Sequence, residues 1–336
     1  MTLWPDCPGA IDHIDADRFS PLGDTSVLMG PAVSFCAPSA PVQAVVIGLD
    51  EAGVLPDVNP DLFDLLLTSA RDAPRPWVSV PAASFASQAE ALAQAVRTWP
   101  VAASMGCQLL RMTQGVPFDH AFQIESLTYS TLLAGGEFAQ WRAGQAGQRP
   151  AQAEGDLIRI ARDGDDVTLT LSSPETRNAM TAAMRDALYG ALANLLDDPT
   201  VPQVTLRAEG PCFSSGGDLG EFGTAGDVAA AHVIRTLHSC ARAIHALGDR
   251  VTVRFHGAAI GSGLEVPAAA ARCIATPDAW FQLPELRMGL IPGAGGTVSV
   301  ARRIGRHRTA WMFLSGKRVS AGAALAMGLV DAVDRA

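Results

Sequence analysis

The chain has 336 residues, of which 48% are hydrophobic and 18% charged, and its formal net charge is −9. This composition is typical of a folded globular protein with one large domain or two smaller ones, and it excludes a disordered chain. The negative charge repels phosphate backbones and no basic run offsets it, so nucleic acid is not expected as a partner.

The cysteines and the amino terminus indicate the compartment. No Cys-x-x-Cys pair or Cys/His cluster occurs, which argues against a zinc site and against a disulfide framework. The first residues lack the pattern of a signal peptide, and no apolar stretch is long enough to span a membrane. We therefore expect a cytoplasmic protein that is not inserted in a membrane. The scattered cysteines are Cys7, Cys36, Cys107, Cys212, Cys240 and Cys273.

The front of the chain is predicted to alternate strands and helices. Residues 42–49 are β-branched and bounded by Pro41 and Asp50, which predicts a buried strand. A helix is expected from about Pro60, where leucines cluster ahead of Pro74 and Pro76, and residues 76–80 are expected to form another strand. Helical periodicity resumes at Ser87, and two further helical runs reach Trp141.

A linker and a second α/β region follow. Residues 142–154 are rich in Gly, Gln and Ala without apolar periodicity, which is typical of a linker. Beyond it strands and helices alternate, which indicates an α/β architecture. The predicted strands are residues 167–171, 201–206 and 251–255, and the predicted helices are residues 181–196 and 229–247.

Two glycine-rich turns carry the first sign of chemistry. The segment 212–219, Cys-Phe-Ser-Ser-Gly-Gly-Asp-Leu, follows one predicted strand, and 256–266, His-Gly-Ala-Ala-Ile-Gly-Ser-Gly-Leu-Glu-Val, follows another. Each turn alone is equally well explained as a tight loop that needs glycine. Together, two turns whose backbone N–H groups converge on one oxygen would form an oxyanion hole, which carbonyl-activating chemistry requires.

Two glutamates stand in unusually apolar surroundings. Glu265 lies in the run that follows the second turn, and Glu285 lies in a third segment, 281–297, which ends in Gly-Ala-Gly-Gly-Thr. Burying a carboxylate without a role is costly. Two carboxyls that face one cavity can hold a water molecule between a base and an acid.

The three segments together resemble the signature of the crotonase, or enoyl-CoA hydratase/isomerase, superfamily over residues 155–334. Residues 315–331 also resemble a run that is habitual in this family. The resemblance implies an α/β fold of the crotonase type, a spiral of ββα units. It also implies an acyl-CoA thioester substrate, with coenzyme A as part of the substrate and no metal or redox cofactor. A homo-oligomer, either a trimer or a dimer of trimers, is expected as well.

Carried over residue by residue, the resemblance assigns the oxyanion donors to the N–H groups of Gly217 and Ser262 and the catalytic carboxyls to Glu265 and Glu285. Because family hydratases have both glutamates, an enoyl-CoA hydratase is predicted. An isomerase, an acyl-CoA hydrolase, a decarboxylase and a catalytically silent acyl-CoA-binding paralogue are the alternatives. The substrate- and CoA-binding residues implied are Arg177, Ser215, Gly216, Asp218, Leu219, Gly261 and Pro284.

Some residues depart from the family pattern. Ser262 stands between two glycines where a third glycine is usual, and its Cβ narrows the expected pocket. Arg254 occupies a strand position that is often apolar, and a structural ion pair is favoured over substrate contact. His256 is expected to support a turn and to have no catalytic role.

The front half resembles displaced family elements. Segments between residues 89 and 141 resemble the helices that follow Gly-Leu-Val in family members. A circular permutation or a degenerate crotonase unit explains this, and an unrelated small α/β domain is the alternative. We therefore divide the chain into residues 1–150, an α/β and helical region, and 151–336, the catalytic domain. Residues 85–141 are expected to pack against the catalytic domain as helices and to cover its acyl channel.

Overall fold

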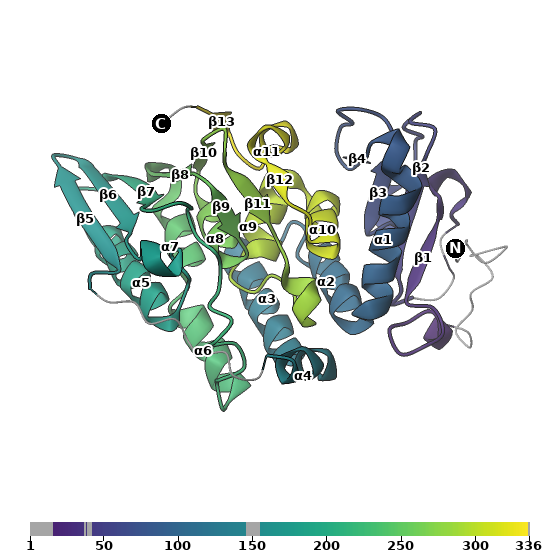
Figure 1. Ribbon diagram of the computed structural model, residues 1–336, viewed down its shortest axis with the longest axis horizontal. Coiled ribbons are helices and arrows are strands. Elements are labelled where there is room, and N and C mark those ends of the chain that lie inside the picture. The colour runs from purple at the N-terminus through teal and green to yellow at the C-terminus, as the bar shows by residue number, and fades with distance from the viewer. Residues whose placement is uncertain (1–15, 37, 39–41, 146–154, 335–336) are drawn as a thin grey trace.

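The computed structural model describes residues 16–36, 38, 42–145 and 155–334. A small sheet and a larger sheet lie at opposite ends of the molecule, and helices α2 (Pro100–Met112) and α3 (Phe118–Leu133) lie between them (Figure 1). No helix in the described part of the chain is long and apolar enough to cross a membrane.

The front sheet has four parallel strands in the order β1-β2-β3-β4. The strand expected at 42–49 is confirmed as β2, and the one at 76–80 is the short β4. The helix expected from Pro60 is wrong, because only a single 3-10 turn forms there and the leucines continue as β3. This strand is buried on both faces, and such a continuous apolar run cannot be distinguished from a buried helix by periodicity. The strands are β1 (Val27–Pro31), β2 (Val45–Asp50), β3 (Leu65–Thr68) and β4 (Val78–Ser79).

Four helices follow, where the sequence predicts three helical runs. In α1 (Phe85–Thr98) the buried residues recur every three or four positions, so one face packs against the core. Pro100 opens α2 at a position where proline costs no hydrogen bond. Helices α1 and α2 contact α10 (Arg306–Ser315). Helix α3 contacts α6 (Val228–Leu237), α7 (Cys240–Leu247) and α9 (Gly296–Ile304). The expectation that this region packs as helices against the second half is confirmed. The last helix, α4 (Gly136–Ala143), includes the start of the predicted linker, whose residues 146–154 lie outside the described residues.

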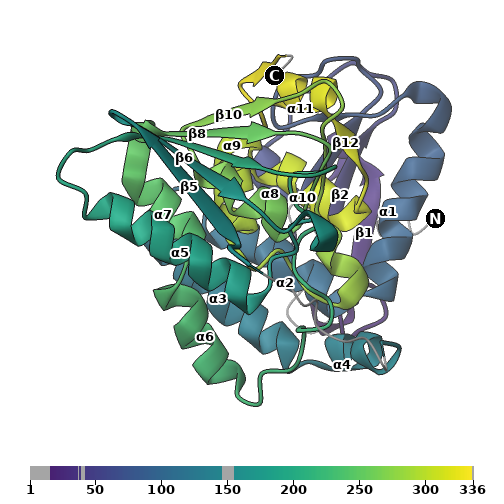
Figure 2. The same cartoon turned by 60° about the vertical axis from the view of Figure 1, so that its left-hand side comes forward.

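The larger sheet has six strands in the order β13-β10-β8-β7-β6-β5, and all neighbours are parallel except the hairpin β5–β6. Figure 2 shows α5 and α7 side by side on one face of this sheet. Strand β5 was not predicted, since it is exposed along most of its length. The strands are β5 (Ile158–Asp163), β6 (Asp166–Leu171), β7 (Gln203–Ala208), β8 (Val251–Phe255), β10 (Arg272–Ala275) and β13 (Ala332–Val333).

The helix predicted over 229–247 is two helices, α6 (Val228–Leu237) and α7 (Cys240–Leu247), so that prediction is corrected. The Ser239 side chain accepts a hydrogen bond from Arg242 N and caps α7, which restarts the chain in a new direction. The helix predicted over 181–196 is confirmed as α5 (Ala182–Leu196), capped by Thr181.

A second small sheet contains β9 (Ala258–Ile260), β11 (Trp280–Gln282) and β12 (Val319–Ser320). The remaining helices of the second half are α8 (Ser262–Glu265), α9 (Gly296–Ile304) and α11 (Ala321–Met327).

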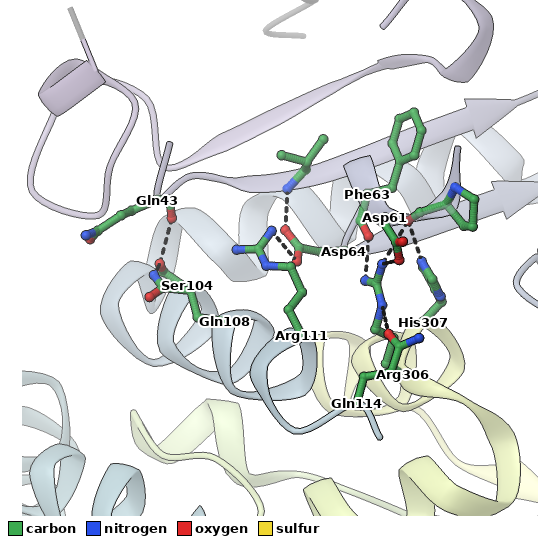
Figure 3. A network of polar contacts seen from close by, with 12 residues as sticks. Gln43, Asp61, Phe63, Asp64, Ser104, Gln108, Arg111, Gln114, Arg306 and His307 are labelled. Carbon is green, nitrogen blue, oxygen red and sulfur yellow. Dashed lines mark hydrogen bonds and ion pairs between the residues drawn. The ribbon is translucent and has the colours of Figure 1, made fainter. Parts of the chain in front are cut away.

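One hydrophobic core joins the two halves. It contains side chains from Val27 in β1 to Val330 beyond α11. Polar contacts also hold the front sheet to α2 of the same half and to α10 of the second half (Figure 3). The buried Asp64 accepts from Val46 N at 2.9 Å and pairs with Arg111 of α2 at 2.9 Å. Arg306 of α10 donates to the carbonyl oxygens of Phe63 and Pro60, at 2.7 and 2.8 Å. The front sheet is thus fixed to the helices that carry the rest of the molecule.

Candidate functional site

The two glycine turns predicted to act together lie against each other. Ser214 N donates to Ala258 O at 3.0 Å, and Ile260 N donates back to Ser214 O at 3.1 Å. Gly216 has a φ of +88°, and an ideal Cβ on it would lie only 2.6 Å from the carbonyl oxygen of Ile260. Glycine is required here because the left-handed backbone and the close approach both exclude a side chain.

Both predicted oxyanion donors line one cavity of about 1190 Å³. Ser262 is the first residue of α8, and Gly261 with a φ of +50° turns the chain into that helix. The first N–H groups of a helix have no intrahelical acceptor. Across the described residues, neither the Gly217 N–H nor the Ser262 N–H donates to a protein acceptor. The two residues are therefore brought to the same cavity with available donors, and their joint action on one oxygen stays a prediction.

Glu265 lies at the end of α8 and is 2% exposed. Its Oε2 accepts hydrogen bonds from Ala294 N at 2.7 Å and Gly296 N at 3.0 Å, in the loop that leads into α9. Burial raises the pKa of Glu265 to about 7, and these two N–H groups oppose the rise. The carboxyl is therefore able to exchange a proton near neutral pH.

Glu285 follows Pro284, and its carboxyl lies beside Gly261, as that of Glu265 does. An ideal Cβ on Gly261 would lie 2.6 Å from Glu285 Oε1 and 3.8 Å from Glu265 Oε1, so the two carboxyls meet beside this glycine. Glu285 Oε2 is buried and has no hydrogen-bond partner among the described residues. Burial, and then the charge of Glu265, hold the pKa of Glu285 well above its usual range.

A third buried carboxyl, Glu125 of α3, was missed by the sequence analysis. Its Oε1 accepts from Gly295 N at 2.6 Å and its Oε2 accepts from Thr297 N at 2.8 Å and from the Thr297 hydroxyl. Burial and the charge of Glu265 raise its pKa to about 8. A signal existed, because Glu125 falls on the helix face of Ala121, Phe122 and Tyr129, which the apolar periodicity marks as buried.

The front helices form part of the cavity wall. Helix α3 contributes Phe122, Tyr129 and Leu133, and α4 contributes Phe138 and Trp141. The expectation that residues 85–141 cover the cavity is therefore confirmed for α3 and α4.

The other predicted binding residues fall into two groups. Six of them line the cavity: Ser215, Gly216, Asp218, Leu219, Gly261 and Pro284. Arg177 is absent from the described residues that line it, and the Arg177 carbonyl instead accepts from Ser215 N at 3.0 Å. Arg177 thus supports the first turn through its backbone, and its contact with coenzyme A stays a prediction.

Two departures from the family pattern have structural partners. His256 Nε2 lies 3.0 Å from the carbonyl oxygen of Gly210, which fits the expected turn role. Arg254 Nη1 lies 3.9 Å from Asp334 Oδ1, and both side chains are about half exposed, so a weak surface ion pair is present.

The fold and the site define an α/β protein whose cavity unites two glycine turns with two buried carboxyls. Residues 166–336 match the family model described as enoyl-CoA hydratase/isomerase. The chain therefore belongs to the enoyl-CoA hydratase/isomerase family, the crotonase superfamily, and the second half has the crotonase-like α/β fold. Members of this family act on acyl-CoA thioesters.

Individual relatives match about half of this chain. A probable enoyl-CoA hydratase of Bacillus subtilis is 32% identical, over 52% of this chain and 68% of its own length. An enoyl-CoA isomerase/hydratase of Mycosarcoma maydis is 31% identical, over 49% of this chain and 64% of its own length. A crystal structure of an enoyl-CoA hydratase from Thermoplasma volcanium has 32% identity and a TM-score of 0.48, and covers 54% of this chain and 72% of that chain.

Proposed function

We propose that the protein is an enoyl-CoA hydratase, which adds water across the 2,3 double bond of an enoyl-CoA thioester. The observation that carries the proposal is the meeting of two buried carboxyls, Glu265 and Glu285, beside Gly261. Adding water to an enoyl group requires a base for the water and an acid for C2. Two carboxyls in different electrostatic environments supply both.

In the proposed reaction, the thioester oxygen accepts hydrogen bonds from the backbone N–H groups of Gly217 and Ser262. Attack of water on C3 breaks the π bond between C2 and C3 and moves negative charge onto that oxygen, where the two fixed dipoles stabilise it. Glu265 takes a proton from the attacking water, and Glu285 delivers a proton to C2. The product is a 3-hydroxyacyl-CoA, and dehydration reverses the two roles.

The surroundings of the carboxyls support this division of roles. Two backbone N–H groups favour the ionised form of Glu265, so Glu265 is suited to act as the base near its pKa of about 7. Burial and the charge of Glu265 hold the pKa of Glu285 well above its usual range, which favours the protonated form and suits an acid. Its buried Oε2 makes no hydrogen bond within the described part of the chain, and the proton is therefore not committed to another protein group.

The proposal includes the remaining expectations for the site. Coenzyme A arrives with the substrate, so the reaction needs no metal and no redox cofactor. Ser215, Gly216, Asp218, Leu219 and Pro284 are proposed to contact the substrate, and Arg177 is proposed to lie near the CoA phosphates. A homo-oligomer, either a trimer or a dimer of trimers, is part of the same proposal.

We further propose that α1–α4 take the place of the helices that follow Gly-Leu-Val in family members. Either a circular permutation or a degenerate crotonase unit would produce this arrangement. The position of α3 and α4 on the cavity wall supports it.

Double-bond isomerisation is the second candidate, because one similar protein carries the name enoyl-CoA isomerase/hydratase. Other reactions of acyl-CoA thioesters, such as hydrolysis and decarboxylation, use the same fold, as does binding without turnover.

An assay with crotonyl-CoA separates these outcomes. Hydration removes the absorbance of the conjugated enoyl group and yields a product heavier by one water, which mass spectrometry identifies. Isomerisation moves a double bond at constant mass, and hydrolysis releases the thiol of coenzyme A. Binding of acyl-CoA without turnover of any enoyl-CoA in a panel of chain lengths would contradict the hydratase proposal.

A further inference from the structure

A cationic side chain lies on the cavity wall, between α3 and α6. Arg235 of α6 lines the cavity, and its Nη1 donates to two serines of α3. The distances are 2.8 Å to Ser126 Oγ, 3.1 Å to Ser130 Oγ and 3.2 Å to the carbonyl oxygen of Ser126. These contacts fix one nitrogen of the guanidinium in place.

In the described part of the chain no carboxylate lies within ion-pair distance of Arg235, and the charge of Glu125 acts on it from farther away. Arg185, which also lines the cavity, differs because it pairs with Asp186 at 2.7 Å. The acidic residues on the cavity wall near α6 accept hydrogen bonds from backbone N–H groups instead. These bonds are Gly220 N to Asp218, Ala182 N to Glu221, and Ala229 N and Ala230 N to Asp227.

An unpaired guanidinium that is partly buried is costly, because it remains charged at physiological pH. Arg235 lies over the Tyr129 ring with its Cζ 4.7 Å from the ring centroid, and this cation–π contact offsets part of the cost. Nε and Nη2 of Arg235 make no hydrogen bond within the described part of the chain. The three N–H groups on these two nitrogens therefore remain available as donors.

Contacts through Tyr129 connect Arg235 to the loop beside Glu265. The Tyr129 ring packs directly against Gly293, where any side chain would collide with it. The next residue, Ala294, donates its N–H to Glu265. The Tyr129 ring thus touches both the guanidinium and the loop that holds a proposed catalytic group.

We propose that Arg235 binds a carboxylate at the far end of the acyl group, so that the substrates are enoyl-CoA thioesters of dicarboxylic acids. Nε and Nη2 lie on one edge of the guanidinium and match the two oxygens of a carboxylate. The inference rests on the proposed function, since it names the substrate class of the same site. It predicts poor use of acyl chains of equal length that end in a methyl group.

The test compares trans-2-hexenoyl-CoA with the thioester in which its terminal methyl is replaced by a carboxylate. The wild type is expected to have a kcat/KM about 10²-fold higher for the carboxylated substrate, the loss typical of one missing partner in a buried charge pair. Arg235→Met should abolish this preference, and Arg235→Lys should restore part of it. His232→Ala is the matched control, because His232 lies on the same helix and contacts Ser126 Oγ at 2.9 Å but is not among the described residues lining the cavity. It should keep the preference.

Calorimetry gives a readout that does not depend on turnover. It uses the saturated counterparts of the two substrates, one ending in a methyl group and the other in a carboxylate. The inference is supported if the wild type binds the carboxylated thioester more tightly and Arg235→Met loses this difference in affinity. This holds even if no hydration occurs, and in that case only the proposed function fails. Equal affinity of the wild type for the two thioesters overturns the inference. The proposed function would then still stand if both enoyl-CoA substrates are hydrated. A loss of affinity in Arg235→Met that is the same for both thioesters also overturns it, because Arg235 would then recognise the coenzyme A part or serve only the fold.

Discussion

Glu125 and Glu265 accept hydrogen bonds from alternate backbone N–H groups where a loop passes into α9. Glu265 accepts from Ala294 and Gly296, and Glu125 accepts from Gly295 and Thr297. Glu125 comes from the front half of the chain and Glu265 from the second half. The geometry of the entry into α9 therefore depends on both halves, and ionisation of either carboxyl raises the pKa of Glu285.

Replacing either proposed proton-transfer group should abolish most hydration. Glu265→Gln and Glu285→Gln are each expected to lower kcat by about 10²- to 10⁴-fold, the usual contribution of a general acid or base. Acyl-CoA affinity should stay close to that of the wild type, because the N–H groups of Gly217 and Ser262 are unchanged. Steady-state kinetics together with calorimetry check both points. Full activity in either variant would remove that carboxyl from the mechanism.

Glu125→Gln should move the alkaline limb of the pH–activity profile to lower pH. The charge of Glu125 contributes to the raised pKa of Glu285, so removing it lets Glu285 lose its proton at lower pH. The profile of kcat/KM with crotonyl-CoA measures this shift. Glu137→Gln is the matched control, since Glu137 also accepts from two backbone N–H groups, those of Val101 and Ala102, but its charge is not among those that raise the pKa of Glu285. An unchanged alkaline limb in Glu125→Gln would contradict the proposed coupling.

Glu285→Gln should stabilise the fold more at pH 8 than at pH 5. The folded-state pKa of Glu285 lies above its unfolded value, so its contribution to stability is fully present below the unfolded pKa and is lost as pH rises toward the folded pKa. Glutamine does not titrate, and the variant avoids that loss. Thermal unfolding followed by circular dichroism at both pH values gives the comparison. A change in Tm of equal size at pH 5 and pH 8 would show that ionisation of Glu285 is not its cause.

The junction in Figure 3 should be sensitive to loss of one charge. Arg111→Met leaves the carboxylate of Asp64 buried without its partner, and we expect a loss of about 3 kcal/mol in the free energy of unfolding. The loss should shrink as pH falls, because Asp64 has a raised pKa and takes up a proton.

Urea unfolding at two pH values measures the effect of Arg111→Met. Arg97→Met is the control, since the Arg97–Glu90 pair is largely exposed and should contribute little. Equal effects of the two substitutions would refute the role given to the buried pair.

The second half of the chain is more predictable from its sequence than the first for a physical reason. At turn positions such as Gly216 and Gly261 almost no other residue type is possible, because a left-handed backbone and the close approach of another chain segment require glycine. The strand at Leu65–Thr68 had no such marker, since a short apolar run buried on all sides satisfies helix and strand patterns equally.

The composition of the cavity wall was harder to foresee. Its residues come from segments far apart in the sequence, and no local pattern states which faces will meet. Glu125 lies on the buried face of α3, but its partners are the backbone N–H groups of residues 170 positions away and more. Only the packing of α3 against α9 reveals that contact.

Successive backbone N–H groups from Ala294 to Thr297 have Glu265 and Glu125 in turn as acceptors, and this has a consequence for amide hydrogen exchange. A bonded N–H exchanges with solvent only when its acceptor withdraws. The amides of Gly295 and Thr297 are released when α3 lifts away, whereas those of Ala294 and Gly296 are released when α8 does. Four successive amides thus report alternately on the opening of two distant parts of the chain, and equal protection of all four would mean that both halves open as one unit.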